Sequence, residues 1–226
     1  MFKIKALAID IDGTITDKSR RLDLEVVQRL RGLEEKGIPV ILASGNILCF
    51  MNAASIMIGT SGPLIAENGG IVEVNDEVYN LSDFEKVERF FDRLSAKYNL
   101  RKVKRSDLRK TEIAIFRDMD IDVLRRELYD ESGVCLVDSK FAIHVMDKNV
   151  NKGSALEFIS KLTCSPLEDI AAIGDGENDF EMLKCAGIGI GIGEESLSDV
   201  SEYVTENHFG KGAVEAIDYL KRNRYI

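Results

Sequence analysis

Short apolar segments alternate with amphipathic ones over the first 70 residues of the chain. Three nearly continuous apolar runs are typical of strands buried on both faces: residues 3–9, 38–43 and 63–66. Apolar positions at helical spacing predict a helix over about Asp23–Lys36, and a second helix is expected over about Asn46–Ile58. Strand, polar turn and helix repeated in this order predict a doubly wound parallel sheet.

The pattern changes in the middle of the chain. A helix, a basic stretch, a strand and another helix are expected there, over about Asp83–Tyr98, 101–110, Glu112–Phe116 and about Ile121–Ser132. Two closely spaced strands follow, Val134–Asp138 and Phe141–Met146, and Ser139-Lys140 between them suggests a hairpin. Because a hairpin pairs its strands antiparallel, this segment predicts a separate α+β unit.

The alternating pattern then returns. The expected elements are a helix over Lys152–Leu162, strand 170–173, a helix over Asp179–Ala186, strands Gly187–Ile190 and Tyr203–Thr205, and a closing helix from about Gly212. We therefore expect an α/β fold in which residues 1–81 and 149–226 form a Rossmann-like core with a doubly wound parallel sheet. Residues 82–148 would be a smaller α+β insertion.

Composition narrows the class of protein. The net charge of −9 over 226 residues argues against a nucleic-acid partner, which usually needs a basic face. No apolar run approaches the ~20 residues of a membrane span, so no membrane partner is expected. The short N-terminal apolar stretch runs into acidic residues and does not resemble a removable signal, so the default expectation is a cytoplasmic protein. Four scattered cysteines without a CxxC pair argue against a zinc site.

Two acidic clusters follow buried strands. The first is Asp10-Ile11-Asp12-Gly13-Thr14, and the second is Gly174-Asp175-Gly176-Glu177-Asn178-Asp179. The carboxyl ends of strands in an open α/β sheet line its ligand crevice. Four carboxylates gathered there would repel one another without a cation, which predicts a hard metal such as Mg²⁺.

Within these clusters, Asp10 is the candidate nucleophile and Asp12 the candidate general acid/base, because both follow the same strand. The alternative is a plain Asp-Gly turn. Asp175 and Asp179 are candidate metal ligands, directly or through water, although Asp179 could instead cap the next helix. Asn178 is a candidate substrate-binding residue, and it could orient a carboxylate or hold its loop.

Two further segments could bind a phosphate. Ser44-Gly45-Asn46, at a strand-to-helix turn, offers a hydroxyl and backbone N–H groups, although such a triplet is often only a helix cap. Lys152 stands at a predicted helix N-terminus, where the macrodipole disfavours a cation, so a role beside the phosphate is expected. The alternative is an exposed lysine without a role.

Together these residues resemble the haloacid dehalogenase superfamily of Mg²⁺-dependent phosphohydrolases. Its four motifs stand in order at Asp10-Ile11-Asp12-Gly13-Thr14, Ser44, Lys152, and Gly174-Asp175 with Asp179. The insertion lies where the branch with the larger cap domain carries its cap. The short chain, Ser-Gly-Asn and Glu67-Asn68-Gly69-Gly70 look most like the phosphoglycolate phosphatases of archaea.

The resemblance implies a mechanism. Asp10 would form an aspartyl-phosphate, and Asp12 would protonate the leaving group and then activate water. Mg²⁺ would be held by Asp10, the Asp12 backbone carbonyl and Asp175, with Asp179 close by. Ser44 and Lys152 would hold the transferring group.

The expected partner is a small phosphorylated metabolite, with 2-phosphoglycolate first and a sugar phosphate or another phosphorylated compound as alternatives. A catalytically silent phosphoryl-ligand sensor is the alternative from another class, and the chain could be a monomer or a homodimer.

Six positively charged residues lie within residues 101–110: Arg101, Lys102, Lys104, Arg105, Arg109 and Lys110. Arg109 is the expected partner of a substrate carboxylate, with Arg105 as the second choice, unless the segment is only a solvated loop. For His144, on a predicted strand, a structural, hydrogen-bonded role is favoured over catalysis.

Overall fold

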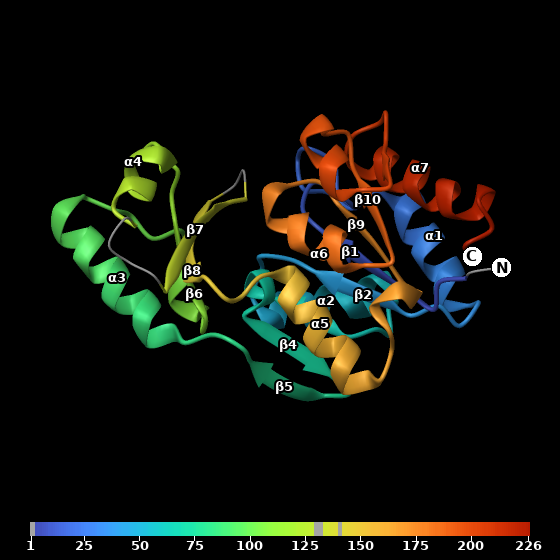
Figure 1. The fold of residues 1–226 in the computed structure, drawn as a ribbon, viewed down its shortest axis with the longest axis horizontal. Helices are drawn as coiled ribbons and strands as arrows, with labels where there is room; N and C mark the ends of the chain where they lie inside the picture. Colours follow the sequence, from blue (N-terminus) through green and yellow to red (C-terminus); the bar gives the residue numbers. More distant parts are fainter. Residues whose placement is uncertain (1–2, 129–132, 140–141) are drawn as a thin grey trace.

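The chain folds around two separate β-sheets. The computed structural model describes residues 3–128, 133–139 and 142–226. An eight-stranded sheet with its helices forms the larger part, here called the core unit, and a three-stranded sheet with two helices forms the smaller part, the cap unit (Figure 1). The expected α/β fold with a separate small antiparallel sheet is therefore confirmed.

The core sheet has the strand order β11-β10-β9-β1-β2-β3-β4-β5 and is parallel except at β4 and β5. Its strands are β1 (Ala6–Asp10), β2 (Val40–Ala43), β3 (Leu64–Ala66), β4 (Ile71–Val74), β5 (Glu77–Asn80), β9 (Ile170–Gly174), β10 (Ile188–Gly191) and β11 (Tyr203–Val204). Its helices are α1 (Leu24–Glu34), α2 (Leu48–Ile58), α5 (Lys152–Thr163), α6 (Phe180–Cys185) and α7 (Phe209–Arg222).

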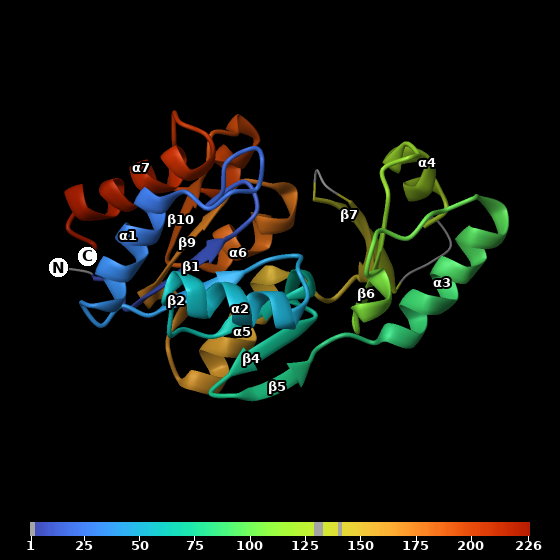
Figure 2. The ribbon, with the colours of Figure 1, turned by 180° about the vertical axis from the view of Figure 1, so that it is seen from behind.

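Helices cover both faces of this sheet. Leu7 and Ile9 of β1 pack into one apolar cluster with α1, α2 and α7, whereas Ala6 and Ala8 pack into another with α5 and α6. Because successive strand residues point to opposite faces, one continuous apolar run serves both clusters. The two helix layers can be followed in Figures 1 and 2, which view the ribbon from opposite sides.

Local sequence signals explain where several helices begin. The Asp23 carboxylate caps α1 by accepting from the backbone N–H groups of Glu25 and Val26. Asn151 and Ser154 form a reciprocal capping box at the start of α5. This capping box fixes the first turn of α5, which carries Lys152.

The cap unit has an antiparallel sheet in the order β6-β8-β7. Its elements are α3 (Phe84–Lys97), β6 (Glu112–Ile115), α4 (Ile121–Arg126), β7 (Val134–Asp138) and β8 (Ile143–Asp147). Phe90 and Phe91 of α3 pack against all three strands in a third apolar cluster. The cap unit thus has its own small core.

Most predicted elements are present, with two differences. The hairpin of β4 and β5 was not predicted, although Asn75 and Asp76 both have positive φ, as a tight hairpin turn between alternating residues requires. The helix predicted to run from Ile121 to Ser132 ends as α4 at Arg126, and its last four positions lie outside the described residues. Lys140 and Phe141 of the predicted hairpin also lie outside them.

The strand order brings the two acidic clusters together. β1 lies between β2 and β9, so the segments after these three strands meet at one edge of the sheet. Gly13 adopts a φ of 96°, and a Cβ there would come within 2.5 Å of Asp175 Oδ2. Glycine therefore allows the first acidic loop to approach the second. Across the described residues, no helix combines the length and apolar character needed to cross a membrane.

Candidate active site

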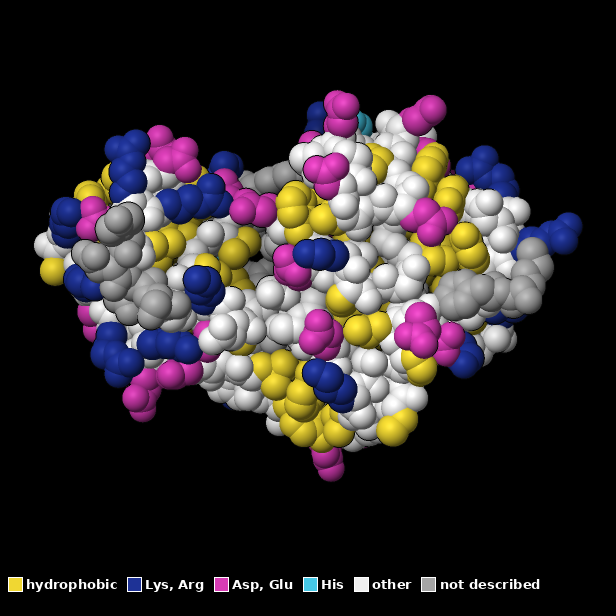
Figure 3. All heavy atoms as spheres, viewed as in Figure 1, with side chains coloured by type: hydrophobic (Ala, Val, Ile, Leu, Met, Phe, Trp, Pro, Cys, Tyr) yellow, Lys and Arg dark blue, Asp and Glu magenta, His cyan; other side chains and the backbone are white. Residues whose placement is uncertain are grey.

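A cavity of about 330 Å³ lies between the core unit and the cap unit. In the space-filling view the surface is hollowed between the two units (Figure 3). The core unit lines the cavity with Asp10, Asp12, Arg20, Ser44, Gly45, Asn46, Asp175, Gly176 and Asn178. The cap unit lines it with Val103, Lys104, Arg109, Phe116, Asp138, Ser139, Ala142 and His144.

A buried ammonium joins the two acidic clusters. Lys152 Nζ lies 2.5 Å from Asp10 Oδ1 and 2.6 Å from Asp179 Oδ1, and its side chain is fully buried. The second oxygen of Asp179 accepts from the backbone N–H groups of Asp175 and Gly176. Lys152 is therefore not the exposed lysine of the alternative interpretation, and the side chain of Asp179 does not cap α6.

Burial and charge act in opposite directions on these groups. Burial raises the pKa of Asp10 well above its usual value, although the Lys152 charge opposes this effect. Burial lowers the pKa of Lys152, but the charges of Asp10 and Asp179 outweigh it and hold that pKa above its usual value. The lysine therefore stays protonated between its two carboxylates.

Three carboxylates could hold a metal ion. Oxygen atoms of Asp10, Asp175 and Asp179 lie within 4.8 Å of one another. Asp10 Oδ2 is buried and accepts no hydrogen bond from the described residues. A buried carboxylate oxygen without a donor, next to a further carboxylate, fits the oxygen-ligand preference of a divalent cation such as Mg²⁺.

Asp12 has different partners from Asp10. Its Oδ2 accepts from Asn46 Nδ2 at 2.6 Å and from Ser44 Oγ at 3.4 Å, and its Oδ1 is 2.7 Å from Arg20 Nε. Its half-buried carboxylate lines the cavity beside the Ser44 loop. The two aspartates of the first cluster thus lie in one cavity, each with its own hydrogen-bond partners.

Arg109 reaches from the cap unit to the core unit. Its Nη1 donates to the Gly45 backbone oxygen at 2.7 Å and forms an ion pair with Glu112. Of the predicted basic stretch, Lys104 and Arg109 line the cavity, whereas Arg101 pairs with Asp118. Arg109 is therefore already partnered by a carboxylate.

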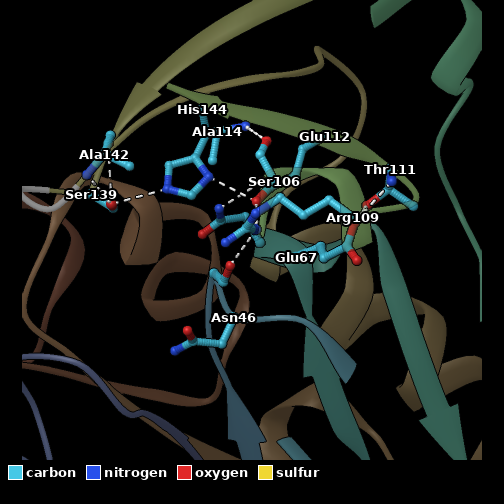
Figure 4. A network of polar contacts seen from close by, with 12 residues as sticks. Asn46, Glu67, Ser106, Arg109, Thr111, Glu112, Ala114, Ser139, Ala142 and His144 are labelled. Carbon is cyan, nitrogen blue, oxygen red and sulfur yellow. Dashed lines mark hydrogen bonds and ion pairs between the residues drawn. The ribbon is translucent and has the colours of Figure 1, made fainter. Parts of the chain in front are cut away.

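Glu112 is the centre of a polar network that Figure 4 shows from close by. Its Oε1 accepts from Arg109 and lies 2.8 Å from His144 Nδ1, and its Oε2 accepts from Asn68 Nδ2 at 2.9 Å. Burial raises the pKa of Glu112, but His144, Arg109 and Asn68 together outweigh it and lower that pKa. Glu112 is therefore ionised.

A second carboxylate ties the cap unit to the core unit. Glu67 Oε2 accepts from the backbone N–H groups of Lys110 and Thr111 and from Thr111 Oγ1. Asn68 in turn accepts from Asn178 Nδ2 at 3.2 Å, so one core loop contacts both the cap unit and the second acidic cluster. Asn178 also lines the cavity, and its role in substrate binding stays a prediction.

The structure brings together the predicted core-unit residues and adds residues that were not predicted. Glu112 was not predicted, since its partners Asn68 and His144 are far away in the sequence. Arg20 was not singled out either, although its partner Asp12 is near in the sequence. Glu67 and Asn68 entered only through the family resemblance, without an expected contact to the cap unit. His144 is hydrogen-bonded, as expected, and also lines the cavity.

Comparison with known proteins places the chain in a family. The family model of haloacid dehalogenase-like hydrolases matches residues 7–104 and 89–217. A phosphoglycolate phosphatase of Methanothermobacter thermautotrophicus is 48% identical over 95% of this chain and 97% of its own. Another of Methanosarcina mazei is 45% identical over 99% of this chain and 100% of its own.

Solved structures agree on the fold. A protein of Thermoplasma acidophilum superposes with a TM-score of 0.89 at 25% identity, covering 99% of this chain and 100% of that one. A phosphatase of Bacteroides thetaiotaomicron superposes with a TM-score of 0.82 at 19% identity, over 99% and 96% of the two chains. Both likenesses extend over the core and cap units.

Replacing Lys152 by methionine tests the buried ammonium. The variant leaves two buried carboxylates facing each other without their cation, so we expect the free energy of unfolding to fall by about 3–5 kcal/mol near neutral pH. Without Lys152 the already raised pKa of Asp10 rises further, and its protonated form is the stable one. The deficit should therefore be smaller at pH 5 than at pH 8.

Urea unfolding in the presence of a chelator measures this difference. Lys161→Met on the same helix is the matched control, because that side chain is 79% exposed and should change stability by no more than about 0.5 kcal/mol. Equal stabilities of the two variants, or a deficit of Lys152→Met that grows as the pH falls, would contradict the role of the ammonium.

Proposed function

The chain belongs to the haloacid dehalogenase-like hydrolases, and on that basis we propose that it hydrolyses phosphomonoesters through an aspartyl-phosphate formed on Asp10. The observation that carries this proposal is the Asp10 carboxylate. One of its oxygens is held by Lys152, and the other is buried at the wall of a cavity, with no hydrogen-bond donor among the residues that the structure describes. Such an oxygen is available to a metal or to phosphorus.

In the first half-reaction, Asp10 is the nucleophile and attacks phosphorus. The bond between phosphorus and the leaving oxygen breaks, and Asp12 gives that oxygen a proton. Asn46 and Arg20 hold the Asp12 carboxylate, so its position is fixed before the substrate binds. Ser44, the Gly45-Asn46 backbone and Lys152 then stabilise the oxygens of the transferring group.

In the second half-reaction, Asp12 takes a proton from water, and the water oxygen attacks phosphorus. The bond between phosphorus and Asp10 breaks, which releases inorganic phosphate and restores the aspartate. Asp12 is thus the acid in one step and the base in the other.

We propose Mg²⁺ as the cofactor, held by Asp10, the Asp12 backbone carbonyl and Asp175, with Asp179 close by. The carboxylate cluster of Asp10, Asp175 and Asp179 supports this choice. When bound, the ion offsets the negative charge that the phosphate brings to these carboxylates.

We propose 2-phosphoglycolate as the substrate for two reasons. The similar proteins share the name phosphoglycolate phosphatase, and charged side chains line the cavity on its core side and on its cap side. The phosphate would bind beside Asp10, and the carboxylate would bind on the cap side, where Arg109 lies. Residues 82–148 would then act as a specificity cap. A cavity of about 330 Å³ suits a small metabolite.

A panel of phosphate monoesters tests the function. With Mg²⁺, we expect 2-phosphoglycolate to give a higher kcat/KM than 2-hydroxyethyl phosphate, sugar phosphates and p-nitrophenyl phosphate. After exhaustive chelation, activity should fall below about one hundredth and should return with Mg²⁺ but poorly with Ca²⁺, whose looser coordination misplaces the attack. Full activity without metal would exclude the proposed mechanism. A sugar phosphate with a higher kcat/KM than 2-phosphoglycolate would exclude 2-phosphoglycolate as the preferred substrate.

Arg109→Ala tests the cap end of the cavity. The change removes the guanidinium and leaves Glu112 without its cation, so KM for phosphoglycolate should rise about tenfold or more. KM for uncharged 2-hydroxyethyl phosphate should change much less. Arg101→Ala is the matched control, because Arg101 is 63% exposed and pairs with Asp118 outside the cavity lining. Equal effects of Arg109→Ala on KM for both esters would mean that Arg109 attracts anions in general and does not contact the carboxylate specifically.

A further inference from the structure

We propose that His144, in its protonated form, is a second cationic contact for the substrate's non-reacting carboxylate, with Glu112 as its positioning residue. This inference rests on the proposed function, because it concerns the selectivity of the same cavity. It makes carboxylate recognition depend on pH through one side chain of the cap unit.

His144 lies at the cavity on the middle strand of the cap sheet. Its side chain is 4% exposed, and it lines the cavity together with Ser139. Nδ1 lies 2.8 Å from Glu112 Oε1, and Nε2 lies 3.0 Å from Ser139 Oγ. Figure 4 shows the imidazole between these two partners, above Arg109.

Glu112 determines which nitrogen carries a proton. An ionised carboxylate only accepts hydrogen bonds, so Nδ1 of His144 must donate to it. A carboxylate fixes the histidine tautomer in the same way in hydrolase triads. The nitrogen that can gain or lose a proton is therefore Nε2, on the side of Ser139.

Ser139 can partner His144 in either state. Its hydroxyl lies 3.0 Å from His144 Nε2 and 3.2 Å from the Ala142 backbone oxygen. With neutral His144, the hydroxyl donates to Nε2. With protonated His144, the hydroxyl can turn its proton to Ala142, so that its oxygen accepts from Nε2–H until a substrate carboxylate takes that place. Neither state leaves a buried polar atom without a partner.

The charges on the cap side of the cavity explain why protonated His144 would favour a substrate carboxylate. Arg109 is neutralised by Glu112, and Asp138 of the neighbouring strand is paired with Arg117. Lys104 lines the same cavity but is exposed, so water screens it more. Protonation of His144 therefore adds one positive charge at a nearly dry position, where a substrate carboxylate needs a partner.

The protonation of His144 determines the direction in which carboxylate binding should depend on pH. At low pH, His144 is charged and the carboxylate binds more tightly. As the pH rises and His144 loses its proton, that contact is lost. The ratio of kcat/KM for phosphoglycolate to kcat/KM for 2-hydroxyethyl phosphate should then fall about tenfold. Using the ratio removes the ionisation of the phosphate, which both esters share.

Two substitutions at His144 test this. His144→Asn keeps a donor near the Nδ1 position for Glu112, and His144→Gln places its amide nearer to Nε2. In both, the ratio should be low and independent of pH, while turnover of 2-hydroxyethyl phosphate reports that the site is still folded. His208→Asn is the matched control. The chain has only two histidines, and His208 lies exposed at the start of α7, so this variant should keep the wild-type pH dependence.

A measurement without a change at His144 covers the case in which both variants misfold. Histidine ring signals in the NMR spectrum of Asp10→Asn protein can be titrated with and without phosphoglycolate. The ligand should favour the protonated form of His144 and leave the His208 signals unchanged.

The outcomes separate this inference from the proposed function. A wild type that prefers neither ester at any pH overturns the proposed substrate and, with it, the inference. A carboxylate preference that does not vary with pH in the wild type, or that His144→Asn retains with its pH dependence, overturns the inference alone. An unchanged His144 titration in the presence of bound phosphoglycolate does the same.

Discussion

The buried ammonium of Lys152 is the interaction on which the arrangement of this site depends. It contacts Asp10 and Asp179, which are 142 and 27 residues away in the sequence. Two buried carboxylates without a cation would repel each other and would be costly to desolvate. The lysine therefore allows the ends of two neighbouring strands to carry acids at one edge of the sheet. It also leaves one oxygen of Asp10 that accepts no hydrogen bond within the described part of the chain, and the proposed chemistry starts from that oxygen.

Carboxylates on the cap side of the cavity also have cations or hydrogen-bond donors beside them. A chain of net charge −9 must offset its own field where an anion binds. Arg109 and Glu112 form a neutral pair, and the Glu67 carboxylate is satisfied by donors at Lys110 and Thr111. These contacts also connect the cap unit to loops of the core unit. Selectivity would therefore depend on a small excess of charge, which His144 can supply or remove.

The sequence predicts the parts of this site that follow from local rules. Continuous apolar strands ending in Asp10 and Asp175 predict their meeting, because carboxyl ends of neighbouring parallel strands share an edge. The misfit of a lysine at a helix N-terminus correctly marks Lys152 as unusual. Glu112 could not be predicted, because its partners Asn68 and His144 are 44 and 32 residues away and lie on other elements. The hairpin of β4 and β5 was missed although its turn residues, Asn75 and Asp76, carry a readable signal.

The most direct test of the central claim, nucleophilic attack by Asp10, is to trap its phosphate adduct. Asp12→Asn lacks the base for the second half-reaction, so with p-nitrophenyl phosphate and Mg²⁺ it should accumulate phosphoenzyme. Acid quench followed by peptide mass spectrometry should locate the phosphate on Asp10, and Asp10→Asn should give no adduct. Release of p-nitrophenol in a single turnover with no adduct at any time, or an adduct on another residue, would contradict the account.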